Sequence, residues 1–215
     1  MNGLLHNKVY GAVLLATIAG EFLLPFILRR FYPGYDWKTM AMSALGGAKS
    51  PVRYIYNAWL IWMGCFLAVT AAVFCADAWR TSAALALLEL LAIGVFAIGA
   101  GLLAGIFHVG ETKGDASLPA KIHGAGAAVG FMALLFFPLW EGILAFGRGE
   151  PLTAWICLAA FLLALVCFTL FVMGDKPSFQ HTVIGYEGLW ERAALFFMYA
   201  PFLCRSITVL LNLST

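Results

Sequence analysis

Two histidines on either side of a short polar loop are the first residues in this sequence whose types and spacing suggest chemistry. His108 ends one apolar segment, and His123 opens the next. Small residues accompany both at helical spacing, and helices that pack in lipid approach most closely on faces of small residues. We therefore expect the two segments to pack on these faces, with both imidazoles in the seam. The small residues are Gly101, Ala104 and Gly105 before His108, and Ala127 and Gly130 after His123.

Imidazoles in such a seam could support hydrolysis or group transfer on a lipid. With a carboxylate or with His181, His108 and His123 could hold a divalent metal, which lowers the pKa of bound water toward neutrality. Without a metal, a histidine could act as a general base. Glu21 completes the candidate catalytic group of His108, His123 and Glu21. Neither HExxH nor HxxxH occurs, so hydrogen-bonded boundary histidines are the simpler interpretation, and haem ligation is disfavoured because both rings lie at one end of their segments.

Three charged residues lie within apolar segments, where each costs roughly 2.5–3.5 kcal/mol on insertion scales and is a functional candidate by default. They are Glu21, Glu89 and Arg205. Glu89 and Arg205 enter from the same side to similar depths, so an ion pair between their helices would offset the desolvation of each charge. We interpret this pair as structural, holding the last helix in register. Glu21 lies about 10 Å from the opposite side, at ~1.5 Å rise per residue.

Further polar side chains gather on the side of the bundle that carries the long loops, while the opposite side offers almost nothing comparable. This asymmetry predicts a polar pocket at one membrane face. Ser43 is disfavoured as a nucleophile because nothing around it resembles a nucleophile elbow. Arginines on this side, Arg29, Arg30, Arg53 and Arg192, would meet phosphate. The residues that we assign to ligand binding are Ser43, Arg53, Asn57, Asp115, Glu187 and Arg192.

The composition determines the kind of protein that must position these residues. Of the 215 residues, 63% are hydrophobic and 11% are charged, far from the averages of soluble domains. The apolar residues fall into runs of roughly 20, the length that crosses ~30 Å of hydrocarbon. We expect an all-α membrane protein rather than a soluble bundle. A net charge of +2 argues against a nucleic-acid partner, and the five cysteines, all in apolar runs, are expected to stay reduced.

The apolar runs predict six transmembrane helices in a single domain, residues 1–215. Both termini then share one side, and the three long loops share the other. Lysine and arginine number nine on the long-loop side and three on the other, so we expect the long loops to be cytoplasmic and the membrane to be the bacterial inner membrane. The last helix is expected to be distorted at Pro201. The predicted helices are 8–28, 52–76, 83–107, 119–140, 152–173 and 189–211.

Three stretches carry a resemblance to a known family: FYPGYDWKTMAMSALGGAKSP at 31–51, GLLAGIFHVGETKGDASLPAKIHGAGAAVGF at 101–131 and GYEGLWERAALFFMYAPFLCRSI at 185–207. In this order they resemble the bacterial membrane family catalogued as domain of unknown function 998. The resemblance implies an integral membrane protein of six to seven helices and carries no activity with it. Members of the family have an acidic residue after the phenylalanine that ends the third helix, where this chain has His108.

We therefore expect a bundle whose pocket, among helices 1, 2, 3, 4 and 6, recognises a lipid or amphiphile headgroup. The alternative is a membrane-embedded hydrolase or transferase that uses the His108 and His123 region. No motif assigns a cofactor, and a divalent metal at these two histidines is the candidate. The expected partners are membrane lipids and a small amphiphilic ligand.

Overall fold

The computed structural model describes residues 3–110 and 115–212, and every regular element in this part of the chain is helical. Five helices are long and apolar enough to cross a membrane, and a bent pair at the C-terminal end makes a sixth span. The predicted all-α membrane bundle is therefore confirmed. The helices are α1 Lys8–Leu28, α2 Arg53–Ala78, α3 Ala83–Phe96, α4 Ala104–Ile106, α5 Leu118–Leu135, α6 Phe137–Gly147, α7 Pro151–Gly174, α8 Glu187–Met198 and α9 Ala200–Leu210.

Polar side chains start several of these helices by accepting hydrogen bonds from backbone N–H groups that have no partner within the helix. Asn7 accepts from Val9 and Tyr10 at the start of α1. Ser82 and Ser117 do the same for α3 and α5. The helix starts thus follow from short local patterns next to the apolar runs.

Three of the predicted helices are interrupted. The third continues from α3 through a π-helical segment, Ala97–Leu103, into the short α4. The fourth is broken at Phe136 and extends beyond the predicted end to Gly147, because Pro138 has no N–H for the preceding turn. The sixth bends by 48° between α8 and α9, just before Pro201, where we expected a distortion.

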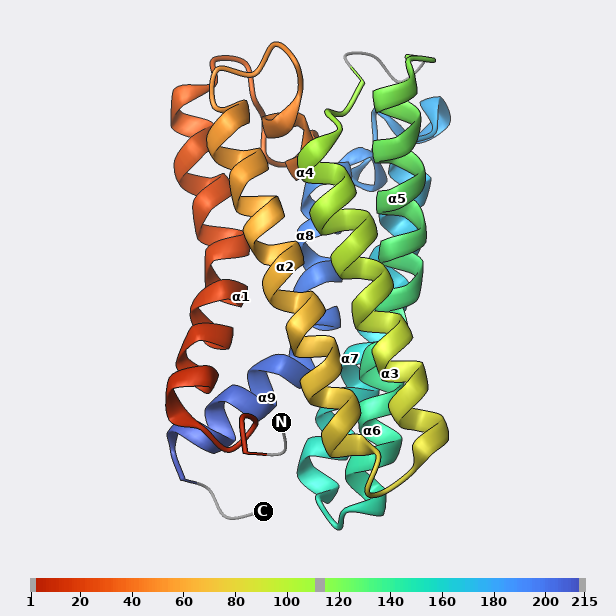
Figure 1. Ribbon diagram of the computed structural model, residues 1–215. Coiled ribbons are helices and arrows are strands. Elements are labelled where there is room, and N and C mark those ends of the chain that lie inside the picture. The colour runs from red at the N-terminus through yellow and green to blue at the C-terminus, as the bar shows by residue number, and fades with distance from the viewer. Residues whose placement is uncertain (1–2, 111–114, 213–215) are drawn as a thin grey trace.

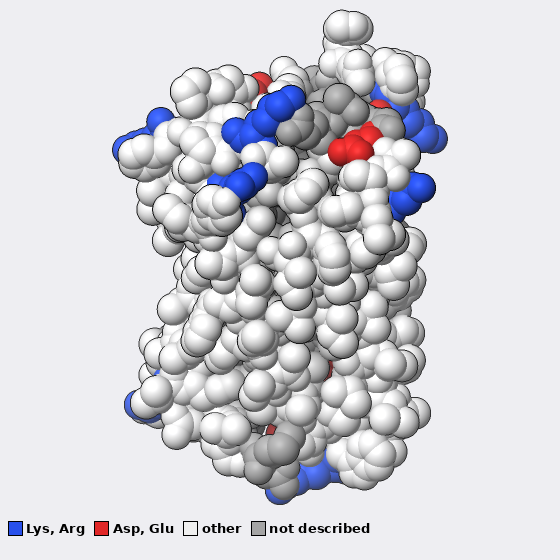
Figure 2. Space-filling view, turned by 45° about the horizontal axis from the view of Figure 1, so that its top comes forward, with Lys and Arg blue, Asp and Glu red and all other residues white. Residues whose placement is uncertain are grey.

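The elongated bundle has two unlike ends (Figure 1). One end, here called the loop end, carries residues 29–52, 107–110, 115–117 and 175–186, which include the 3-10 turns Arg29–Phe31 and Met42–Gly46. The other, the turn end, carries the short α2–α3 and α6–α7 connections together with the start of α1 and the end of α9. Lysine and arginine gather at the loop end above an uncharged belt (Figure 2).

Glycines bring three of the helices into backbone contact. A Cβ at Gly99 would overlap the carbonyl oxygen of Gly126, so the π-helical segment and α5 touch at these positions. Gly101, however, packs on Gly64, and Gly105 packs on α2 as well. The expected seam between the third and fourth helices therefore forms through Gly99, and Gly130 packs on Ala100 in the same seam. Gly101 and Gly105 face α2 instead, because they lie on the other side of the helix.

Candidate functional site

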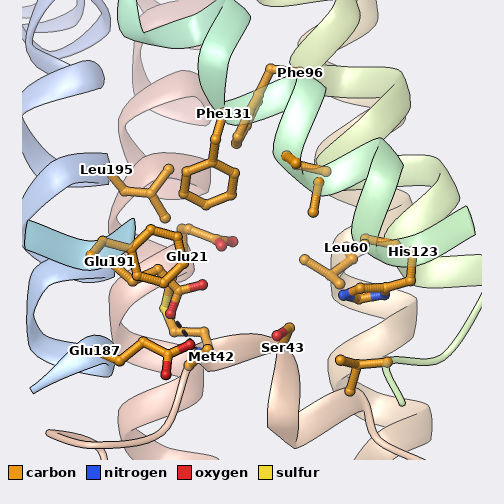
Figure 3. Close-up of a pocket in the computed structure, with 18 of the residues that line it drawn as sticks. Glu21, Met42, Ser43, Leu60, Phe96, His123, Phe131, Glu187, Glu191 and Leu195 are labelled. Carbon is orange, nitrogen blue, oxygen red and sulfur yellow. Dashed lines mark hydrogen bonds between the residues drawn. The ribbon is translucent and has the colours of Figure 1, made fainter. Parts of the chain in front are cut away.

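An internal cavity of about 290 Å³ lies near the loop end among α1, α2, α3, α5, α7 and α8 (Figure 3). Small-molecule pockets span about 300–1,000 Å³, so this cavity is at the lower end of that range. Most of its wall is apolar, while its polar groups come from opposite sides. The apolar side chains include Leu60, Met63, Phe96, Phe131, Phe168 and Leu195, and the polar ones are Glu21, Ser43, Tyr56, His123, Glu187 and Glu191.

Glu21 of α1 is 3% exposed and lies in the cavity wall. Its Oε2 accepts a hydrogen bond of 2.7 Å from the indole nitrogen of Trp59 on α2. Within the described part of the chain, the one hydrogen bond to this carboxylate is the one to Oε2, and Oε1 accepts none. One oxygen of this carboxylate is therefore held by the protein, and the other is left for the cavity.

Glu191 of α8 lies beside Glu21, and its carboxylate is arranged in the same way (Figure 3). Its Oε2 accepts from the backbone N–H of Met42 at 2.6 Å, which ties the first loop to α8. Its Oε1 accepts no hydrogen bond from residues 3–110 and 115–212. Two carboxylates at least 95% buried thus share one end of the cavity.

Arg192 is the cation nearest to this pair, yet it is not part of the cavity wall. Its guanidinium donates to the carbonyl oxygens of Trp37 at 2.9 Å and Gly188 at 2.6 Å, and to the hydroxyl of Tyr35 at 2.7 Å. Burial raises the pKa of Tyr35 to about 12, although Arg192 acts in the opposite direction. Arg192 therefore fixes the first loop on α8 from a position outside the cavity wall.

The two histidines have different surroundings. His123 is buried in the cavity wall, opposite the two carboxylates, and its Nδ1 lies 2.9 Å from the carbonyl oxygen of Phe107 (Figure 3). His108 is half-buried outside the wall, and its Nδ1 lies 3.2 Å from the carbonyl oxygen of Val109. His108 acts on His123 only electrostatically. The seam therefore presents one imidazole to the cavity, not two.

No three metal-ligating side chains converge anywhere in the part of the chain that the structure describes. His181 is exposed in the α7–α8 connection. Glu111, a carboxylate of the loop between the histidines, lies outside the described residues. The metal site at His108 and His123 therefore stays a prediction without structural support.

A second hollow of about 450 Å³, here called the vestibule, adjoins the cavity at the loop end. The cavity and the vestibule share Ala41, Ser43, Val109 and Glu187, which form the neck between them. Asp115 lies in the vestibule wall, where its Oδ1 accepts from the backbone N–H of Ser117. Three of the assigned ligand-binding residues, Ser43, Asp115 and Glu187, are thus placed along one route into the bundle.

The other assigned ligand-binding residues, Arg53, Asn57 and Arg192, lie outside both walls. Arg53 donates to the carbonyl oxygen of Ala48 at 2.7 Å and also contacts the hydroxyl of Tyr54. Asn57 donates to the carbonyl oxygen of Gly46 at 3.4 Å. These donors satisfy loop carbonyls that have no helical partner, so they brace the first loop rather than line the cavity.

The turn end holds a buried network of charges, contrary to our expectation that this side offers little. Arg148 contacts Asp77 and Glu141, each at 2.9 Å. Arg205 contacts the same two carboxylates at 3.4 and 3.7 Å. Burial opposes the charge of Arg148, but Glu141 and Asp77 outweigh it and raise the pKa of this guanidinium.

The predicted ion pair between Glu89 and Arg205 is not formed. Glu89 is fully buried beside Glu141, and neither of its oxygens has a hydrogen-bond donor among the described residues. Arg205 is occupied by Asp77 and Glu141 instead. The sequence predicted Glu89 as the partner of Arg205 because both lie at a similar depth in the membrane. Asp77 and Arg148 lie just beyond the predicted apolar runs, and their side chains reach into the bundle.

Comparison with known proteins identifies the family. A family model described as "Protein of unknown function (DUF998)" matches residues 5–207, nearly the whole chain. The chain belongs to the DUF998 family. No curated protein and no solved structure matches it. The function of this DUF998 protein must therefore be argued from the cavity and its chemistry.

Sequence reasoning assigned two parts of this DUF998 site no role. Glu191 lies in the charged first turn of the last helix, one turn after Glu187 and next to Arg192, and this position is typical of a solvated helix start. The aromatic wall contributed by α7, Phe168 and Phe171, was missed entirely. Apolar residues in a membrane span give no signal that separates a cavity wall from a lipid-facing surface.

Proposed function

We propose that the cavity binds an amphiphilic molecule, with its apolar part against the aromatic side chains and its polar head near the loop end. The observation that carries this proposal is the composition of the wall. Apolar side chains cover most of it, and buried carboxylates with an unpaired oxygen lie at one place, Glu21 and Glu191. A purely apolar ligand would leave these oxygens without a partner, and a fully polar ligand would not match the rest of the wall.

Two routes into the cavity fit such a ligand. The vestibule leads to it from the loop end through the neck at Ser43 and Glu187. Gly124, Ala128 and Val172 also line the cavity and are exposed, so its wall reaches the side of the bundle between α5 and α7. An amphiphile dissolved in the membrane could enter from this side. Within this proposal the loop end is cytoplasmic and the membrane is the bacterial inner membrane, as the distribution of lysine and arginine favours.

Hydrolysis or group transfer is the weaker candidate. It is supported by the presence of His123, Ser43 and two carboxylates in one wall. It requires a base and a nucleophile, or a metal, in contact with one another. His123 faces the carboxylates across the cavity rather than bonding to them (Figure 3), and His108 lies outside the wall.

The test is saturable binding by protein in lipid nanodiscs. Radiolabelled decyltrimethylammonium, decyl phosphocholine, decanoate and decanol share one tail and differ in the head. We expect one equivalent of at least one of them to bind, and Ala127→Trp, which fills the cavity, to abolish binding. Val129→Trp is the matched control on the same helix, since Val129 is 52% exposed and outside the wall. Absence of saturable binding by all four, or equal binding by the two variants, would overturn the proposal.

A further inference from the structure

Carboxylates outnumber basic side chains in the cavity wall. Glu21, Glu187 and Glu191 line it, and no lysine or arginine does so in the described part of the chain. His123 is the one basic side chain among the described wall residues.

The two inner carboxylates are incompletely satisfied. The Trp59 indole and the Met42 backbone each supply one hydrogen bond, to Glu21 and Glu191 respectively. The second oxygen of each carboxylate has no hydrogen bond to a described residue, and Figure 3 shows both groups turned into the cavity. Neither oxygen is among the fully buried acceptors that lack a partner, which agrees with oxygens that face the cavity. A ligand that filled the cavity without donating to them would bury them unpaired, which is costly, and more so for a charged group. Both observations point to a donor or a cation supplied from outside the chain.

An anionic head does not fit the same place. Recognition of phosphate or carboxylate uses arginine forks or other directed donors. Arg192 donates to Trp37, Gly188 and Tyr35, and Arg53 donates to Ala48. Both arginines lie outside the cavity wall. The phosphate contact that these arginines suggested in the sequence therefore has no counterpart in the cavity.

Aromatic rings complete the match to a cation. Tyr56, Phe96, Phe131, Phe168 and Phe171 line the cavity together with the two carboxylates. Aromatic faces attract ammonium groups within about 6 Å, and such rings recognise quaternary ammonium ligands. The same rings provide an apolar surface for a tail. Carboxylates and aromatic rings together are therefore the chemistry of an ammonium site.

We infer that the cavity selects cationic amphiphiles, with an amine or quaternary ammonium head between Glu21 and Glu191 and an alkyl or aryl tail along the aromatic wall. This inference rests on the proposed function and adds the class of the head. Binding of the cation supplies the counter-charge that the chain itself does not direct into the cavity. Because the cavity is at the small end of ligand pockets, the ligand has one chain rather than two.

The four decyl compounds in nanodiscs test this inference separately from the proposed function. We expect decyltrimethylammonium to bind at least about tenfold more tightly than decanol, and decanoate to bind weakest, because charge-assisted contacts exceed neutral ones. Tighter binding of decanol, decanoate or decyl phosphocholine would overturn the inference and leave amphiphile binding intact. Absence of binding by all four overturns both.

Substitutions test whether the two carboxylates cause the preference for a cationic head. Glu21→Gln and Glu191→Gln keep the side-chain shape and an acceptor oxygen, and each should weaken decyltrimethylammonium binding about ten- to a hundredfold while decanol binding changes little. Glu150→Gln at the turn end is the matched control and should leave both affinities unchanged. Unfolding temperatures show which variants are folded. If both folded variants keep the wild-type preference for the cation, the carboxylates do not hold the head and the inference fails.

Discussion

The indole of Trp59 donates a hydrogen bond of 2.7 Å to the carboxylate of Glu21, joining α2 to α1 inside the apolar part of the bundle. Trp59→Phe removes the donor and leaves a buried oxygen unsatisfied, which costs about 1–3 kcal/mol. We predict a loss of stability of this size, measured as the free energy of unfolding in mixed micelles. Trp62→Phe, on the same helix at a 52% exposed position, should cost much less.

A double-mutant cycle separates the hydrogen bond from packing, because Trp59 also packs against Gly20. Charge-assisted bonds are stronger than neutral ones. In a Glu21→Gln background, Trp59→Phe should therefore cost less than in the wild type. Equal costs in the two backgrounds would show that the bond contributes nothing and that Trp59 acts by shape alone.

The turn-end network makes a second prediction about which of its charges matter. Arg148 and Arg205 both contact Asp77 and Glu141, so two cations already balance two carboxylates. Removing one partner of a buried pair costs about 3–5 kcal/mol. Arg205→Met and Glu141→Gln should each destabilise the fold by roughly this amount, measured by reversible unfolding.

Glu89→Gln should cost less than about 1 kcal/mol, because Glu89 has no direct cationic partner among the described residues and lies beside another carboxylate. The amide keeps its shape, and it can donate to Glu141. A cost for Glu89→Gln as large as that for Glu141→Gln would show that Glu89 is ionised and belongs to the ion-pair network.

The contact between Gly99 and Gly126 predicts a difference between neighbouring glycines. A Cβ at Gly99 would overlap the backbone of Gly126, and helix backbones cannot yield as flexible side chains do. Gly99→Ala should therefore lose about 1–3 kcal/mol, the usual cost of overpacking. Gly94→Ala is the control, since a Cβ there meets nothing within 4 Å, and it should be neutral or stabilising by up to about 1 kcal/mol. Equal effects would contradict the close packing.

The helices of this fold could be predicted from the sequence because each span needs a long apolar run, and because Asn7, Ser82 and Ser117 mark helix starts locally. Which helices pack against each other could not be predicted. Gly101 and Gly105 are small residues in a helix, and nothing in their spacing decides whether they face α2 or α5. The π-helical segment Ala97–Leu103 changes the helical register, so that Gly99 faces α5 while Gly101 and Gly105 face α2. The spacing of apolar residues gives no sign of this change in register.

The candidate site was predictable only in part, for a physical reason. A charged residue inside an apolar span is conspicuous in the sequence, and Glu21 could therefore be predicted as a site residue. The wall of a cavity consists mostly of apolar side chains that do not pack against one another. In the sequence these residues cannot be distinguished from apolar residues that face lipid. Arg192 and Arg53 were assigned to ligand binding by type, but arginines at helix ends also serve loop carbonyls, and only the geometry separates these two uses.

Ionisation of Tyr35 should lower the stability of the fold at alkaline pH. Its hydroxyl accepts a hydrogen bond from Arg192 at 2.7 Å and donates to the carbonyl oxygen of Ala41 at 3.2 Å. Burial raises the pKa of Tyr35 from 10.0 to about 12, so the folded state holds this proton more tightly than the unfolded chain. This contribution to stability is fully present below pH 10.0 and is lost as the pH rises to about 12.

Comparison of the wild type with Tyr35→Phe isolates this contribution from the other tyrosines. Phenylalanine cannot ionise, so the free energy of unfolding of the variant should fall less steeply between pH 10.0 and about 12. At neutral pH the variant should be less stable by about 1 kcal/mol, because it loses the bonds to Arg192 and Ala41. The two curves should then approach each other as the pH rises. Parallel curves over this range would mean that Tyr35 does not hold its proton more tightly in the folded protein.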